Sequence, residues 1–178
     1  MAVGILGGRF DPPHVGHLAL ARTAVEHFRL DELHVTVVAD AAHKPSEASA
    51  EHRLAMARLT FAGLDATVEL ERHRYTVDAL EEERHDDPIF LIGADQLAAF
   101  PTWKEPERVL QLARLGVAAR PGWEPEPGSG RIEVFELEPH PVSSTEIRER
   151  IRRGEPIDGL VVPAVAAYIA ERDLYRGA

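Results

Sequence analysis

The sequence predicts a single α/β domain in which a mostly parallel β-sheet is flanked by helices on both faces. Short apolar, β-branched runs alternate with amphipathic stretches along the chain, and strands joined by helices form parallel sheets. The length of 178 residues fits one domain with a sizeable core. No internal repeat or interdomain linker interrupts the alternation, so we expect residues 1–178 to form one domain.

Each element follows from composition and periodicity. The strands are expected at Val3–Leu6, Leu33–Val38, Ala66–Leu70, Ile89–Ile92, Leu115–Ala119 and Ile132–Phe135. The helices are expected at Gly16–Phe28, Ala50–Ala62, Thr76–Glu83, Pro106–Leu112, Ser144–Arg152 and Pro163–Arg172. Doubly wound, Rossmann-like sheets of this kind bind ligands beyond the carboxyl ends of their strands, where the strand order reverses. The glycine turn after the first strand is the natural place for a ligand.

The segment Gly7–His17, with the sequence GGRFDPPHVGH, joins the first strand to the first helix. It places His14 and His17 three residues apart, where backbone N–H groups and the helix dipole favour an anion. Glycines let the backbone approach such a ligand closely. The dinucleotide spacing GxGxxG and the P-loop GxxxxGK[ST] are both missing, and no HExxH or cysteine supports a metal site. The segment indicates a polyphosphate site, and a capping pair or a solvated first turn is the alternative.

The bulk composition excludes several classes of protein. The formal net charge of −10 argues against general nucleic-acid binding. The absence of cysteine excludes disulfides and thiolate chemistry and is compatible with the cytoplasm. No run approaches the roughly 18 apolar residues of a membrane span, and no leader-like segment precedes the first strand. Local positive charge is concentrated after the Ser-Ser-Thr at 143–145, at Arg148, Arg150, Arg152 and Arg153.

Two motifs in order resemble those of the nucleotidyltransferase superfamily of adenylyl- and cytidylyltransferases. The first is Gly7–His17, and the second is Ser143–Arg148, with the sequence SSTEIR. Between them, the chain is similar to the bacterial nicotinate mononucleotide adenylyltransferase family at Arg74–Thr76, Ile92–Leu97, Phe100–Trp103 and Arg120–Gly122. The resemblance runs from Val3 to Tyr175, with a C-terminal helical part at about 143–178.

This resemblance implies an ATP site around the two motifs. His14 and His17 would contact the phosphates, with His17 at the α-phosphate, and Ser144, Thr145 and Arg148 would bind the β- and γ-phosphates. A capped surface helix, with Ser144 or Thr145 as N-cap, is the alternative for the second motif. Lys44 would clamp anions and, with His14, His17 and Arg148, complete the catalytic set. The remaining ATP contacts would come from Gly7, Gly8, Arg9, Phe10 and Asp95.

Two of these positions have further interpretations. Asp95 either accepts from ribose hydroxyls or caps a short helix over Gln96–Phe100. Asp11 is expected to be a structural turn residue and not a base. The chain departs from the family pattern at Arg9, where Thr or Ser is usual, and at Ala41–Ala42, where prolines are common.

The resemblance also implies an acceptor site for nicotinate mononucleotide. Trp103 would stack on the pyridinium ring, since an indole face attracts a flat cation. Tyr75 and Thr76 open a helix, where a hydroxyl and backbone N–H groups suit the ring carboxylate. Lys44 and Arg120 would complete this site. These features favour nicotinate over nicotinamide.

The implied reaction is transfer of the adenylyl group of ATP to nicotinate mononucleotide, with Mg²⁺ bound to ATP, in cytoplasmic NAD biosynthesis. The acceptor phosphate is already largely ionised at neutral pH, so alignment and charge stabilisation matter more than a strong base. Nicotinamide mononucleotide or phosphopantetheine as acceptor, and a catalytically silent nucleotide-binding protein, remain alternatives. The oligomeric state, including a homo-oligomer, stays open. We expect no nucleic-acid partner and no membrane association.

Overall fold

The computed structural model describes residues 1–39, 45–123 and 130–177. It contains one sheet of six parallel strands in the order β3-β2-β1-β4-β5-β6. The described strands are β1 (Val3–Gly8), β2 (Glu32–Val38), β3 (Ala66–Glu71), β4 (Ile89–Gly93), β5 (Arg114–Ala119) and β6 (Ile132–Glu136). The described helices are α1 (Val15–Phe28), α2 (Ala50–Phe61), α3 (Thr76–Glu83), α4 (Ala94–Ala99), α5 (Pro106–Leu112), α6 (Ser144–Arg152) and α7 (Pro163–Glu171), with a 3₁₀ turn η1 (Phe100–Thr102) after α4.

The predicted fold class is confirmed, and the sheet is parallel throughout the described strands. Each predicted strand and helix is present to within two residues at either end. The short helix α4 overlaps the stretch Gln96–Phe100 that one interpretation of Asp95 made helical, and the turn η1 follows it. Among the described residues, no helix is long and apolar enough to cross a membrane.

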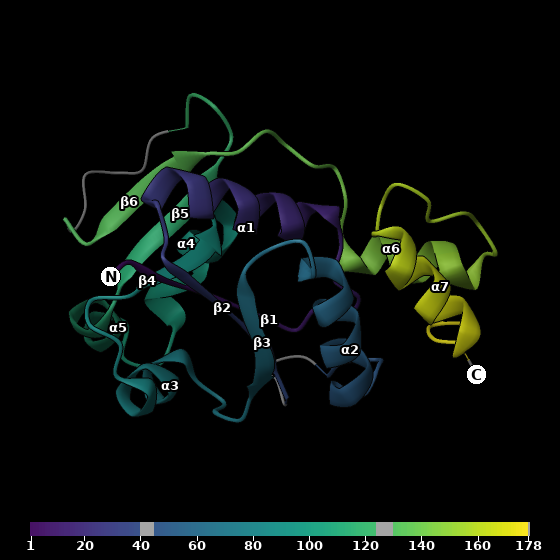
Figure 1. Cartoon of the computed structure of the whole chain (residues 1–178), viewed down its shortest axis with the longest axis horizontal. Coiled ribbons are helices and arrows are strands. Elements are labelled where there is room, and N and C mark those ends of the chain that lie inside the picture. Colours follow the sequence, from purple (N-terminus) through teal and green to yellow (C-terminus); the bar gives the residue numbers. More distant parts are fainter. Residues whose placement is uncertain (40–44, 124–129, 178) are drawn as a thin grey trace.

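Strand alternation divides the core between the two faces of the sheet. On β1, Leu6 packs under the face covered by α1 and α2, and Ile5 packs under the face covered by α3 and α5. On β4, Leu91 and Ile92 divide between the faces in the same way. Both faces of a parallel sheet are thereby buried, and Figure 1 shows the helices in layers around it.

The helices α6 and α7 form a third packed group with α2. Ile147, Val165 and Ile169 are buried against Met56, which is fully buried on α2. Figure 1 shows this pair at one end of the molecule, next to α2. The segment before α7 contacts the start of α1, where Val15 N donates to Leu160 O at 3.0 Å. The start of α6 contacts the turn before α1, where the Ser144 hydroxyl donates to Pro12 O at 2.8 Å. The two sequence motifs therefore meet at one place.

Candidate active site

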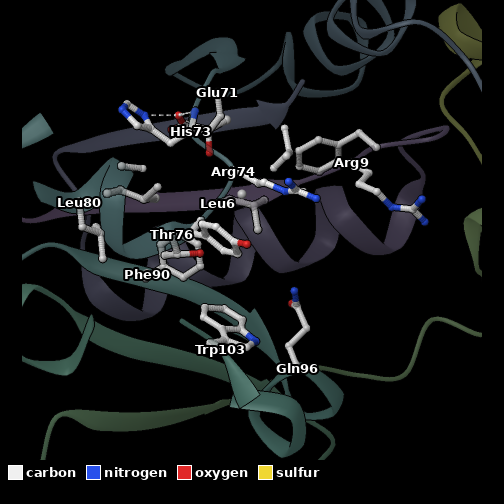
Figure 2. A pocket seen from close by; sticks show the side chains of 18 of the residues that line it. Leu6, Arg9, Glu71, His73, Arg74, Thr76, Leu80, Phe90, Gln96 and Trp103 are labelled. Carbon is white, nitrogen blue, oxygen red and sulfur yellow. Dashed lines mark hydrogen bonds and ion pairs between the residues drawn. The ribbon is translucent and has the colours of Figure 1, made fainter. Parts of the chain in front are cut away.

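A cavity of about 520 Å³ opens at the carboxyl end of β1 and extends toward α3 (Figure 2). Its walls include Gly7 and Gly8 from β1, Thr36 and Val38 from β2, and Ser144 from α6. Because β1 pairs with both β2 and β4, this is the point where the strand order reverses. The cavity lies where the sequence predicted a ligand, and its volume is typical of small-molecule sites.

The two glycines at the end of β1 are required by close packing. A Cβ on Gly8 would lie 3.1–3.3 Å from ring carbons of Phe10, and one on Gly7 would lie 3.3 Å from Phe90 and from Thr36 Oγ1. Phe10 has a φ of 52° and is 2% exposed. Its ring packs edge-on against His17, with centroids 5.0 Å apart. Phe10 therefore fills the space beneath the turn and fixes the position of the His17 ring.

His14 and His17 form a capping pair at the start of α1, and His17 also lines the cavity. His14 is the N-cap of α1, and its Nδ1 accepts from Gly16 N at 3.1 Å. The Nδ1 of His17 accepts from His14 N at 3.1 Å. The two rings stack with centroids 3.7 Å apart. Since each Nδ1 is an acceptor, each neutral ring carries its proton on Nε2, where it can be donated to a ligand.

Both imidazoles are neutral at physiological pH. Burial, and secondarily the nearby His140, lower the pKa of His14 to about 4. Burial and the adjacent His14 lower the pKa of His17 well below its usual range. His17 lines the cavity directly, and His14 lies behind it in the stack. The two interpretations of the histidine pair, as a helix cap and as a phosphate contact, are therefore compatible. The cap uses Nδ1 of each ring and does not use Nε2.

Asp11 is a buried structural anchor for the turn, as expected from the sequence. Its carboxylate is 2% exposed and accepts from Glu47 N at 2.7 Å, from Ala48 N at 3.1 Å and from the Tyr175 hydroxyl at 2.8 Å. Burial, followed by Asp11, raises the pKa of Tyr175 far above its usual range, so the hydroxyl stays a donor. The carboxylate thus joins the turn after β1 to the segment before α2 and to the chain beyond α7.

Arg53 is a structural residue that sequence reasoning missed. It lies on α2 and is 1% exposed, and its guanidinium donates to four backbone carbonyls. These are Arg9 O at 2.8 Å, Val38 O at 2.7 Å, Ala39 O at 3.0 Å and Ala48 O at 3.1 Å. The guanidinium therefore ties the ends of β1 and β2 together beside the cavity. No local sequence signal marks it, because its acceptors come from separate segments.

The second motif begins α6, but its N-cap is Ser143, whose hydroxyl accepts from Glu146 N at 3.1 Å. Assignment of the cap to Ser144 or Thr145 was wrong by one or two residues. Ser144 is the first helical residue and instead donates to Pro12 O at 2.8 Å, which brings it to the cavity wall. Thr145, the next residue, is exposed at the same helix end. The start of α6 thus lies beside the turn that leads into α1.

Arg148 is 6% exposed and braces the turn from behind. It donates from Nη1 to Asp11 O at 2.7 Å, from Nε to Glu47 Oε1 at 3.1 Å and from Nη2 to Thr145 Oγ1 at 3.4 Å. The idea that α6 supplies concentrated positive charge needs correction, because each of its arginines has a carboxylate partner. These pairs are Arg148 and Arg152 with Glu47, Arg150 with Glu146, and Arg153 with Glu155.

The other end of the cavity is aromatic. Trp103 lies at the end of η1, half-buried, with its ring 6.0 Å from Phe90 and 5.2 Å from Phe100, edge-on to both. Tyr75 is the N-cap of α3 and Thr76 is its first residue, and both line the cavity. Figure 2 shows Trp103, Thr76 and Phe90 around the same cavity. The structure therefore brings together the residues predicted for the acceptor ring.

The remaining predicted residues are Asp95, Arg120, Lys44 and Arg9, and of these only Arg9 is among the described residues that line the cavity. Asp95 is exposed in the first turn of α4 and not at its N-cap, which is Gly93. Arg120 is exposed directly after β5 and is not among the cavity-lining residues. Lys44 and Ala41–Ala42 lie outside the described residues. Arg9 lines the cavity and donates to Pro45 O at 3.1 Å.

The sheet is Rossmann-like, and two helix starts and a pair of neutral imidazoles lie at the point where its strand order reverses. This combination defines a nucleotide-binding protein of the nucleotidyltransferase type. The cytidylyltransferase-like family model matches residues 5–150. A Chromobacterium violaceum protein named "probable nicotinate-nucleotide adenylyltransferase" is 37% identical, covering 98% of this chain and 98% of its own length. A Gemmatimonas aurantiaca protein of the same name is 40% identical, with 99% and 93% covered. The chain therefore belongs to the cytidylyltransferase-like family, as its motifs indicated.

Solved structures agree on the fold. The Plasmodium falciparum nicotinic acid mononucleotide adenylyltransferase complexed with NaAD superposes with a TM-score of 0.82 at 18% identity, covering 98% of this chain and 97% of that one. Its complex with APC gives a TM-score of 0.79, with 98% and 96% covered. At this identity the likeness concerns the fold.

Asp11→Asn should lower the free energy of unfolding by about 2–4 kcal/mol, because a buried amide cannot accept from all three donors. Urea denaturation measures the change. Asp31→Asn is the matched control, since the Asp31 carboxylate accepts from Ala2 N at an exposed position; there we expect less than about 1 kcal/mol. Equal, small changes in the two variants would contradict the anchoring role.

The lowered pKa of His14 makes stability depend on pH. The folded state keeps the ring neutral down to about pH 4, whereas the unfolded chain protonates it below about pH 6.5. The contribution of His14 to the free energy of unfolding is therefore fully present above pH 6.5 and is lost as the pH falls toward 4. Between pH 7.5 and 5.0 this loss is about 2 kcal/mol. His14→Asn keeps a capping oxygen but does not titrate. Urea denaturation of both proteins should show the smaller acid loss in the variant; parallel losses would refute the assignment.

Proposed function

We propose that the chain transfers the adenylyl group of ATP to nicotinate mononucleotide, giving nicotinate adenine dinucleotide and pyrophosphate in NAD biosynthesis. The observation that carries the proposal is one cavity with His17 and Ser144 at one end and Trp103 and Thr76 at the other. The full-length relatives that carry the name of this activity support it. We also propose a cytoplasmic location, with which the absence of cysteine is compatible.

The chemical step needs no strong base. The acceptor phosphate has a second pKa of about 6 and is mostly a dianion at neutral pH. One of its oxygens attacks the α-phosphorus of ATP, a new P–O bond forms, and the bond from the α-phosphorus to the β-phosphate oxygen breaks. Pyrophosphate leaves with the electron pair. The protein has to align two anions that repel each other and to stabilise the negative charge of the transition state.

His17 is placed to stabilise that charge. With its Nδ1 held by His14 N, its Nε2–H is free of the cap and can donate to an α-phosphate oxygen at the cavity. A neutral donor keeps its proton throughout the reaction, so the enzyme needs no proton release in this step. His14 stacks on His17, and its contact with the same phosphates is proposed from the family resemblance.

The β- and γ-phosphates would lie at the start of α6. Ser144 and Thr145 stand at a helix N-terminus, where backbone N–H groups favour an anion. The 3.4 Å contact from Arg148 Nη2 to Thr145 Oγ1 is long, and a phosphate oxygen would be a better acceptor. Gly7, Gly8, Arg9 and Phe10 shape the turn beneath the phosphates. For Lys44, Asp95 and Arg120 the proposal rests on the family resemblance.

Mg²⁺ would enter with ATP and not as a resident metal. Among the described residues, no three His, Cys, Asp or Glu side chains are grouped to hold a metal ion. The buried carboxylate of Asp11 is engaged by three protein donors. A Mg²⁺ ion held by the phosphates would neutralise part of their charge and assist departure of pyrophosphate.

The acceptor ring would lie against Trp103. An indole face attracts a pyridinium cation and also excludes water from it. The Thr76 hydroxyl and the first N–H groups of α3 would bind the ring substituent, and Tyr75 closes that wall. A carboxylate suits a helix N-terminus better than an amide does, so nicotinate mononucleotide is the proposed acceptor.

Pyrophosphate release with Mg-ATP and each of three acceptors tests the function. We expect release with nicotinate mononucleotide to exceed release with nicotinamide mononucleotide and with phosphopantetheine. Release with phosphopantetheine alone would keep the phosphate site and overturn the acceptor pocket. No pyrophosphate release with any of the three acceptors would indicate a nucleotide-binding protein without turnover. Arg9→Thr, which introduces a residue usual in the family, would then be the first variant to test for activity.

His17→Ala should lower kcat by about two to four powers of ten, the scale of losing a transition-state donor. The KM values should change much less. His27→Ala is the matched control, since His27 lies exposed near the end of the same helix and pairs with Glu133. Urea denaturation of both variants measures how far loss of the helix cap lowers the free energy of unfolding, so that this effect is distinguished from the effect of the lost donor on kcat. Near-normal turnover in His17→Ala would overturn its role.

A further inference from the structure

Lys104 is a cation at the ring end of the cavity that the sequence motifs did not single out. It follows Trp103 and lines the same cavity, with 40% of its side chain exposed. Its Nζ lies 5.1 Å from the centroid of the Tyr75 ring. Its backbone position beside Trp103 and its ammonium beside Tyr75 place it between the two sides of the proposed ring pocket.

The ammonium is held in place by Asp78 on the first turn of α3. Nζ donates to Asp78 Oδ1 at 2.7 Å and to Oδ2 at 3.0 Å. This hydrogen bond raises the pKa of Lys104, so the side chain is charged at neutral pH. An ammonium has three donors, and Asp78 uses two of them. One N–H is therefore left for a ligand, on a side chain whose position is already fixed.

The wall of the cavity formed by the end of β3 and by α3 carries charges of both signs. Glu71 and Glu83 line it, and so does Arg74. Burial, and then the charges of Glu71 and Glu69, raise the pKa of Glu83, and His73 compensates part of this charge by pairing with Glu71 at 2.7 Å (Figure 2). Carboxylates on this wall attract the pyridinium cation but repel a carboxylate on the ring. Cations that line the cavity offset that repulsion, and among them Lys104 stands beside Trp103.

We infer that Lys104 is a specificity-determining residue that favours a carboxylate over a neutral amide on the acceptor ring. This inference rests on the proposed function, because it assumes that a pyridine nucleotide occupies the cavity. The ammonium would bridge Asp78 and the ring carboxylate, as an addition to the Thr76 end of α3. An amide carries no charge and gains little from the same ammonium. Lys104 thus acts on selectivity, while His17 acts on the chemical step.

The test compares the two mononucleotides as acceptors. For each protein, kcat/KM is measured with nicotinate and with nicotinamide mononucleotide, and the ratio of the two gives the selectivity. Lys104→Gln should lower this ratio about two- to fivefold, the size expected for a partly exposed charge pair. Lys104→Arg, which keeps the charge, should restore most of it. The selectivity of the native protein should also fall as ionic strength rises.

Two further variants separate charge from structure. Arg108 forms the neighbouring ion pair between α5 and α3, with its Nε 2.9 Å from Glu81 Oε1, so Arg108→Gln weakens the same helix contact without touching the cavity. It should leave the ratio unchanged. Asp78→Asn keeps an acceptor oxygen for the ammonium but removes the competing negative charge, and it should increase the preference for nicotinate. A Lys104→Gln variant that loses both acceptors equally, or an Arg108→Gln variant with the same loss of selectivity, would overturn the inference.

Calorimetric binding of the two mononucleotides, without ATP, keeps this inference distinct from the proposed function. If the native protein binds nicotinate mononucleotide more tightly but shows no turnover, the proposed function fails, and the dissociation constants of the Lys104 variants still decide the inference. If turnover is present and the Lys104→Gln selectivity equals that of the native protein, the inference fails alone. Failure to bind either mononucleotide would overturn both.

Discussion

The buried carboxylate of Asp11 is the contact on which the geometry of the site depends. It accepts hydrogen bonds from two backbone N–H groups before α2 and from the Tyr175 hydroxyl after α7. Its own backbone carbonyl accepts from Arg148 on α6. One residue of the turn is therefore held by three separate segments. Because interiors are close-packed and stiff, a turn held in this way presents Phe10 and the two imidazoles in one arrangement.

Within this frame, the same atoms serve the fold and the chemistry. In the cap of α1, the Nδ1 atoms of His14 and His17 accept hydrogen bonds from the backbone N–H groups of Gly16 and His14. The same hydrogen bonds select the tautomer of each ring. Burial then keeps both rings uncharged. Stability and the protonation state of the donors thus have one origin. A change that loosens the cap also changes which nitrogen carries the proton, so folding and catalysis cannot be tuned independently here.

Features carried by local patterns could be predicted from the sequence, and features made by distant partners could not. Strand and helix periodicity located the elements, and the motifs located His17, Ser144, Trp103 and Thr76 at one cavity. Arg53 resembles an ordinary surface arginine of an amphipathic helix, because the carbonyls that surround it converge only in the folded chain.

The arginines of α6 and the acidic residue after β4 show the same limit. The sequence suggested a positive cluster on α6, but Glu47, about a hundred positions away, neutralises two of its members. Asp95 fits a cap on composition alone, yet α4 starts one residue before it, since Gln96 Oε1 accepts from Gly93 N and completes the helix start. Ion-pair partners and the first residue of a helix depend on tertiary packing, and the periodicity of the sequence carries no information about that packing.

The link between Asp11 and Tyr175 spans 164 positions and so has a consequence during synthesis. A ribosome adding about 5–20 residues per second needs roughly ten to thirty seconds to travel from one to the other. For that time the nascent chain carries the complete glycine turn and both imidazoles, while the carboxylate beneath them lacks its phenolic partner. The turn after β1 is thus synthesised well before the residue that completes its anchoring.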